Sequence, residues 1–148
     1  VCKIIGVNYT KWETKNRYLT GSDIEDMDEF IQQSLMKYHE FNSETIDYLA
    51  RIYGTEIDAL MSLAVKYKSV PAGVTREMLA QVEYAVKNEM AFTLADILFR
   101  RTGIGGLGHP GKKTLNEIAS FAAKLLGWDS KQLKSEIAEV EKIFKIPS

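Results

Sequence analysis

Capping residues recur along this chain, each followed by apolar residues at helical spacing, and this pattern limits the fold more than any other feature. Ser, Thr, Asn and Asp side chains accept hydrogen bonds from the free amides of a first helical turn. Apolar residues three and four positions apart then share one face of the helix. The predicted caps are Ser22, Asn42, Thr55, Thr75, Thr93, Thr114 and Asp129.

Each cap introduces a stretch that we expect to be one helix with a buried face. Ser22 with Glu25 and Thr93 with Asp96 also read as capping boxes, and Thr114 with Glu117 is expected to begin a helix. Glycine is typical of helix ends, and Gly54, Gly103 and Gly127 follow three of the stretches. The predicted inward residues include Phe30, Ile31, Leu35, Ile46, Leu49, Tyr53, Leu60, Met61, Val65, Leu79, Val82, Met90, Leu115, Ile118, Ala122, Leu133, Ile137 and Val140.

Strand signals are weak in comparison. The apolar run at residues 4–7 is the one candidate strand, and residues 69–73 contain a proline and a glycine typical of a loop. Successive helices with short connections favour an all-α fold, an antiparallel bundle of about six or seven short helices. We expect residues 22–148 to form one helical domain. Residues 1–21 read as a connector and the severed end of a preceding domain, or alternatively as a basic and aromatic arm for nucleic acid.

Charge and cysteine content exclude several classes of protein. The net charge of -1 gives no general attraction to nucleic acid or anionic lipid. A single cysteine excludes an internal disulfide framework and a cysteine-based zinc cluster. No apolar run approaches the ~20 residues of a transmembrane helix. The chain starts with valine and has no signal-peptide pattern, so we expect a piece of a larger, cytoplasmic protein.

A glycine-rich loop contains two phosphate-binding patterns that lack the required context. Residues 103–108 fit G-x-G-x-x-G, and residues 106–112 fit the start of a P-loop, but Lys113 stands where Ser or Thr should be. Both motifs need a buried strand before the loop, and residues 95–101 read as a charged helix. We interpret the loop as a connector, with only generic anion affinity from Lys112 and Lys113 at the following helix start.

No constellation of catalytic or metal-binding residues emerges from the rest of the chain. His39 and His109, the two histidines, have no metal-ligand spacing, and no serine lies in a nucleophile elbow. Acidic residues crowd positions 23–29, where they suit the first turn of a helix. The sequence therefore predicts no catalytic, cofactor-binding or metal site within this chain.

The segment from residue 83 to residue 102 is the most informative one for function. Asp96 and Arg100 are one helical turn apart and are expected to pair, while Glu89 precedes the turn and could reach a second arginine. Adjacent arginines on a helix point ~100° apart, so one of Arg100 and Arg101 could bond internally while the other faces a partner. We predict an interface formed by Glu89, Asp96, Arg100 and Arg101.

This segment resembles the C-terminal domain of the FAD-dependent glycerol-3-phosphate dehydrogenases and glycerophosphate oxidases. Tyr84, Glu89 with Met90, Thr93, Asp96 and the run 100–102 match the family pattern in order and spacing. The helix ending in Tyr53-Gly54 and the Leu126-Gly127-Trp128 run extend the resemblance over about residues 20–145. The chain departs from the family in its glycine-rich loop and at residues 18–21, where the family tends to have a Pro-Gly turn.

The resemblance implies a division of labour within a larger enzyme. The parent would oxidise glycerol 3-phosphate to dihydroxyacetone phosphate, reducing FAD and then quinone or another acceptor. FAD and substrate would lie in an N-terminal domain, and this chain would be a non-catalytic accessory domain with no cofactor of its own. Its expected partner is that flavin domain, with self-association left open, as is docking of the parent at the inner face of the membrane.

A different class of function stays open at this point. The stretches 75–88 and 93–102 could form a helix-turn-helix whose Arg100 and Arg101 reach phosphates. The chain would then be a free-standing helical module that binds protein or nucleic acid, although the charge balance gives no reason to expect nucleic acid.

Overall fold

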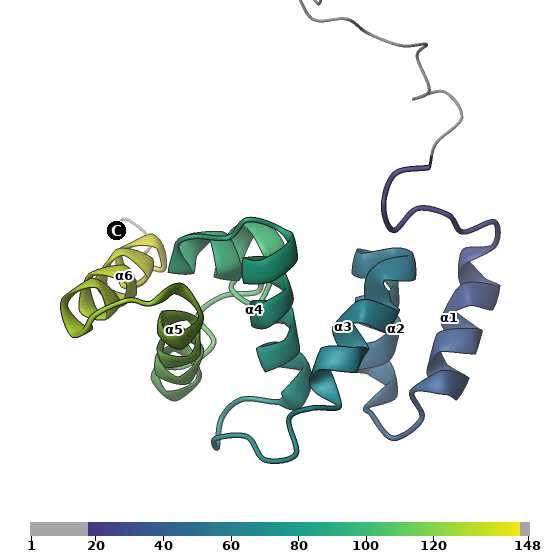
Figure 1. Cartoon of the computed structure of the whole chain (residues 1–148), viewed down its shortest axis with the longest axis horizontal. Coiled ribbons are helices and arrows are strands. Elements are labelled where there is room, and N and C mark those ends of the chain that lie inside the picture. The colour runs from purple at the N-terminus through teal and green to yellow at the C-terminus, as the bar shows by residue number, and fades with distance from the viewer. Residues whose placement is uncertain (1–17, 146–148) are drawn as a thin grey trace, which may run out of the picture. The chain divides into compact units, whose positions relative to one another are not determined.

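A computed structural model of the chain describes residues 18–145, which contain helices and no strand (Figure 1). The all-helical prediction is confirmed. The elements in order are α1 (Met27–Lys37), α2 (Ser43–Tyr53), the 3-10 turn η2 (Gly54–Glu56), α3 (Ile57–Ala64), α4 (Arg76–Asn88), the π-helical turn η3 (Asp96–Arg101), α5 (Lys112–Leu126) and α6 (Ser130–Ile143). The candidate strand at residues 4–7 and most of the expected connector lie outside the described residues.

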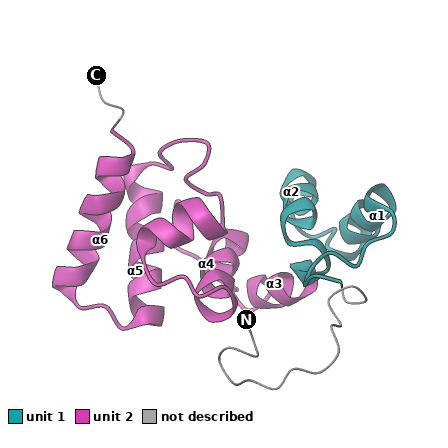
Figure 2. Cartoon of the chain, turned by 90° about the horizontal axis from the view of Figure 1, so that it is seen from above, with its two compact units in different colours: residues 1–57 teal, residues 58–148 magenta. Residues whose placement is uncertain are grey.

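The chain divides into two compact units, residues 1–57 and residues 58–148 (Figure 2). Helices α1 and α2 pack together in the first unit, with Ile31, Ile46 and Leu49 buried. The segment before α1 is bonded to the segment after α2, since the Thr55 amide donates to the Gly21 carbonyl at 3.2 Å. Gly54 has a φ of +52°, and a side chain there would lie 1.8 Å from the same carbonyl oxygen. Glycine is therefore required at this helix end.

The second unit has a continuous apolar core. Helix α4 lies against α5 and η3, and α5 lies against α6. The buried side chains are Val74, Leu79, Val82, Ala85, Ala91, Leu94, Ile97, Leu98, Leu115, Ile118, Ala119, Ala122 and Val140. The buried side chains on α4, α5 and α6 are ones that the sequence pattern predicts to face inward, and their burial stabilises the unit.

Tyr67, Glu83 and Lys87 form a polar cluster in the same unit. The Tyr67 hydroxyl and the Lys87 ammonium both donate to the carboxylate of Glu83. The Tyr67 ring also meets the Phe121 ring edge-on, with centroids 5.7 Å apart. This cluster joins the loop after α3 to α4 and α5.

The predicted caps at Ser22 and Thr114 are wrong. The Ser22 hydroxyl donates to the Leu19 carbonyl in a turn, and Asp26 caps α1 instead, accepting from the amides of Asp28 and Glu29. Helix α5 begins at Lys112, and the Thr114 hydroxyl donates to the Gly73 carbonyl at 2.7 Å. In both cases the hydroxyl is used as a donor to a carbonyl outside the expected helix.

Three residues that the sequence pattern places on the inward faces are exposed. Met27 is the first residue of α1 and is 39% exposed. Val65 follows the end of α3, where the chain leaves the helix. Met90 follows the end of α4 and has a φ of +57°, so its side chain turns away from the helical stripe. No helix among residues 18–145 is both long enough and apolar enough to cross a membrane.

Candidate interaction site

The end of α4 redirects the chain sharply before the predicted interface. Glu89 is the C-cap, and the amides of Glu89 and Ala91 both donate to the Ala85 carbonyl, at 3.2 Å and 3.1 Å. Between them Met90 adopts the left-handed backbone conformation, the one non-glycine residue in the described part of the chain to do so. L-residues other than Gly, Asn and Asp seldom take this conformation. The reversal buries Ala91 and leaves Met90 on the surface.

A reciprocal capping box begins the next turn, as the sequence predicts. The Thr93 amide donates to Asp96 Oδ2 at 3.1 Å, and the Asp96 amide donates to the Thr93 hydroxyl at 3.1 Å. The Phe92 amide also points at Asp96 Oδ2, at 3.4 Å. These bonds satisfy amides that a helix start otherwise leaves unpaired.

Arg100 pairs with Asp96, as the spacing predicts. Arg100 Nη1 donates to Asp96 Oδ1 at 2.6 Å. Burial raises the pKa of the Asp96 carboxyl, but the hydrogen bonds from Thr93, from the Phe92 amide and from Arg100 outweigh it, and the net pKa lies below its ordinary value. The Arg100 side chain is 75% exposed and that of Asp96 only 17%, so the positive group is on the outside.

Glu89 and Arg101 form a second, looser charge relationship. Burial raises the pKa of the Glu89 carboxyl, and the positive charge of Arg101 partly opposes this rise. Glu89 Oε2 is buried and has no hydrogen-bond partner among the described residues. The carboxylate is thus held at the edge of the core beside an exposed arginine.

The turn that carries both arginines is wound as a π-helix. The Thr102 amide and hydroxyl both donate to the Ile97 carbonyl, five residues earlier, at 3.1 Å and 2.7 Å. Its hydroxyl also accepts from the Ile104 amide at 3.3 Å, and Thr102 is buried. Thr102 therefore ends the turn and fixes the start of the glycine-rich loop.

Two neighbouring apolar side chains stand out on the surface of this turn. Met90 is 72% exposed and Phe92 is 62% exposed, on either side of buried Ala91. Sequence reasoning placed Met90 in the core and did not single out Phe92. The alternation of a large apolar, a small and a large apolar residue at positions 90–92 was the one signal in the sequence. It indicates exposed side chains only if the left-handed turn at Met90 is already known.

The glycine-rich loop lies apart from any nucleotide-binding context. It follows the π-helical turn instead of a strand, and the Gly105 amide bonds back to the Leu98 carbonyl at 2.9 Å. His109 accepts from the Gly111 amide, contacts Glu141 at 3.3 Å and lies against the Phe144 ring. Gly105 and His109 thus tie the loop to η3 and to the end of α6, and the loop lacks the strand-to-helix setting of a dinucleotide site.

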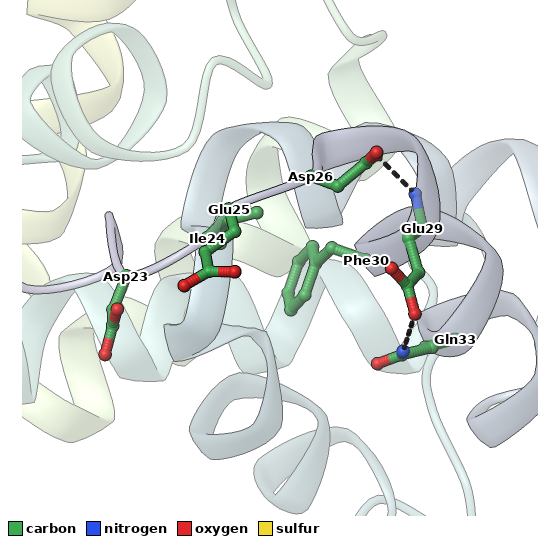
Figure 3. A pocket seen from close by; sticks show the side chains of 7 residues that line it. All are labelled: Asp23, Ile24, Glu25, Asp26, Glu29, Phe30 and Gln33. Carbon is green, nitrogen blue, oxygen red and sulfur yellow. Dashed lines mark hydrogen bonds between the residues drawn. The ribbon is translucent and has the colours of Figure 1, made fainter.

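The acidic residues before α1 line a shallow hollow of about 200 Å³ (Figure 3). Asp26 accepts from the Glu29 amide, Glu29 accepts from the Gln33 side chain at 3.1 Å, and the Phe30 side chain also lines the hollow. These bonds belong to the helix start and its first turns. Within residues 18–145 no group of three His, Cys, Asp or Glu side chains is arranged to hold a metal ion.

Comparison with known proteins gives the family. Residues 12–133 match the sequence model for the C-terminal domain of alpha-glycerophosphate oxidase. The chain belongs to this family. The match covers most of the resemblance stated above and every residue of the site from Glu89 to Thr102.

Curated relatives of the family agree with the match. Over 135 residues the chain is 30% identical to a probable mitochondrial glycerol-3-phosphate dehydrogenase of Dictyostelium discoideum, which covers 89% of this chain and 21% of the relative. The aerobic glycerol-3-phosphate dehydrogenase of Staphylococcus saprophyticus is 26% identical over 103 residues, covering 66% of this chain and 18% of the relative. The Staphylococcus aureus enzyme is 24% identical over 151 residues, covering 97% and 27%. The chain therefore spans about a fifth to a quarter of the length of these relatives.

Proposed function

We propose that this chain serves as the helical accessory domain of a flavin-linked glycerol-3-phosphate dehydrogenase and performs no redox step itself. The observation that carries the proposal is the family match over residues 12–133, together with relatives named as glycerol-3-phosphate dehydrogenases that are about five times as long as the matched part. The rest of such a protein would oxidise glycerol 3-phosphate to dihydroxyacetone phosphate, reduce FAD and pass the electrons to quinone or another acceptor.

The chemistry of the described residues supports an accessory role. Thr93, Asp96 and Thr102 bond to one another or to the backbone, and Arg100 bonds to Asp96, so these bonds hold the turn in shape. The glycine-rich loop does not fit FAD, since no strand delivers it and the loop folds back on the preceding turn. We derive no step through FAD from these residues and assign the flavin to a separate portion of the protein.

The proposed role of the four predicted site residues follows from their positions. Asp96 and Glu89 shape and charge the inner side of the turn, and Arg100 and Arg101 are exposed for contact with the flavin-bearing portion. Self-association is the alternative use of the same surface. We place the protein in the cytoplasm, at the membrane periphery if quinone is the acceptor.

Two measurements test the proposal. Purified residues 1–148 should show no flavin absorbance near 450 nm and no glycerol-3-phosphate-dependent dye reduction. The protein expressed from its complete reading frame should show both. A yellow preparation of residues 1–148 that reduces dye would overturn the assignment of the flavin to another portion, and a complete protein without flavin would overturn the parent activity.

A further inference from the structure

The surface around residue 90 combines two properties that rarely coincide without a partner. Met90 and Phe92 project apolar side chains into solvent, although burying such groups is favourable. Met90 does so from a left-handed backbone conformation that costs an L-residue free energy. Backbone strain of this kind persists where the surrounding structure and the function require it.

The same surface carries a positive charge directed outward. Asp96 links the two sides of the surface, since it accepts from the Phe92 amide and from Arg100 Nη1. A guanidinium has five N–H donors, so the largely exposed Arg100 keeps donors for a partner's carboxylate. The positive charge of Arg101 acts on Glu89, next to Met90. Met, Phe and Arg are the residue types enriched at the centres of protein interfaces.

We propose that Met90, Phe92 and Arg100 form the docking surface through which this domain binds the flavin-bearing portion of its own protein. The inference rests on the proposed function. It commits to a partner surface with an apolar recess for the two side chains and a carboxylate for Arg100. The occupant follows from the length of the relatives, because about three quarters or more of each lies outside the part that matches this chain.

Site-specific photo-cross-linking in the protein expressed from its complete reading frame tests this surface. Phe92 is replaced by p-benzoylphenylalanine, which keeps an aromatic ring at the position. The matched control places the same amino acid at Met36, which is 71% exposed on α1. We expect irradiation to join position 92 to a peptide outside residues 1–148, and position 36 to give no link to that peptide.

Two variants examine which side chains make the contact. Met90→Ser and Arg100→Glu should each abolish the cross-linked peptide, because the first removes an apolar contact and the second opposes like charges. Arg51→Glu is the control, since Arg51 also pairs with an aspartate one turn earlier, Asp47. We expect it to leave the cross-link in place. Equal thermal midpoints for the variants would show that each is folded.

The outcomes separate this inference from the proposed function. A preparation whose flavin is bleached by glycerol 3-phosphate, but in which position 92 links to nothing or to another copy of the chain, overturns the docking surface and keeps the proposed function. A preparation without flavin overturns the proposed function, and the docking inference with it. Bleaching together with the expected link supports both.

Discussion

The carboxylate of Glu136 on α6 accepts a hydrogen bond from the backbone amide of Leu94, 42 residues earlier, at 2.8 Å. Leu94 is fully buried and lies just after the Thr93 cap, where a helix start leaves its amide without a backbone partner. A side chain from the last helix therefore completes the cap of the turn that carries the candidate site.

Removing this acceptor should destabilise the second unit. Glu136→Ala leaves the Leu94 amide unpaired, and we expect a loss of about 1–3 kcal/mol in the free energy of unfolding. Glu136→Gln keeps an acceptor oxygen and should lose less. Urea unfolding measures both, with Glu139→Ala on the same helix as the control. Glu139 is exposed and pairs with exposed Lys142, three residues later, so a comparable loss there would refute the role of Glu136.

The Tyr67–Glu83–Lys87 cluster should make the free energy of unfolding depend on pH in two ranges, an acidic one set by Glu83 and an alkaline one set by Tyr67. Partial burial raises the pKa of Glu83, but the hydrogen bonds from Lys87 and Tyr67 outweigh it and leave that pKa below its ordinary value. Stability from Glu83 is thus present above its unfolded pKa and lost as pH falls through the folded one. Burial, followed by the bond to Glu83, raises the pKa of Tyr67, so its contribution is lost only as pH rises through the alkaline range.

Tyr67→Phe tests the alkaline window of this cluster. We expect the variant to lose about 1–2 kcal/mol of stability at neutral pH, since a hydrogen bond to a charged acceptor disappears. The difference between wild type and variant should shrink as pH rises above about 10, the ordinary pKa of tyrosine. Thermal unfolding over a pH series records it, and a difference that does not change with pH would contradict the prediction.

Ionisation of Glu89 should change the stability with pH in the opposite direction to ionisation of Glu83. Burial raises the pKa of its carboxyl, so the folded state binds the proton more tightly and stability falls as pH rises through the interval between the unfolded and folded values. Glu89→Gln removes this ionisation. We expect it to raise stability above pH 6 by about 1 kcal/mol or less, and to have little effect near pH 4. A loss of stability at neutral pH would instead show that attraction to Arg101 dominates.

Gly105 should tolerate no side chain while Phe99 is present. A Cβ at Gly105 would lie 2.7 Å from Phe99 Cε1, and the Phe99 ring packs against Phe144 with centroids 5.1 Å apart. Gly105→Ala is expected to cost about 1–3 kcal/mol, as overpacking does. In a Phe99→Leu background the same change should cost clearly less, so a double-mutant cycle gives the coupling. Additive losses would disprove the clash.

Met90→Gly should stabilise residues 1–148 and weaken docking. Glycine adopts the left-handed conformation without a Cβ penalty, so we expect a gain of up to about 1 kcal/mol in the free energy of unfolding. Phe92→Ser, at the neighbouring exposed position with no left-handed backbone, is the control and should give no gain. A Met90→Gly variant that is less stable than wild type would mean that the Met90 side chain packs within the unit.

Local signals in the sequence predicted the helices and most of the candidate turn. The Asn42 and Thr93 caps, the Asp96–Arg100 pair and the Gly54 and Gly127 helix ends depend on neighbours within four residues or on the backbone itself. Such features need no knowledge of the fold. The interface role of these residues, and the boundary at residue 21, stay predictions.

Features that depend on distant partners could not be predicted. Thr114 has the same local pattern as Thr93, but the Thr114 hydroxyl donates to a carbonyl 41 residues away. Glu136 falls on a polar stretch of α6, and nothing nearby marks it as the cap of Leu94. The helical spacing predicts that Met90 lies on the buried stripe of α4. The chain reverses before that point and buries Ala91 in its place, which the spacing alone does not indicate. Where the local sequence fits two arrangements equally well, contacts with residues distant in the sequence determine which one forms.

The π-helical turn from Asp96 to Arg101 has a consequence for how this family could vary in length. A π turn has one residue more than an α turn, so deleting a single residue within it would let an ordinary helix close. The residues after the deletion would then rotate by about 100° relative to those before it. Arg101 would inherit the bond to Asp96, and no arginine would remain beside Glu89. An insertion or deletion at this one place would redistribute the charges of the surface while every helix around it stayed intact.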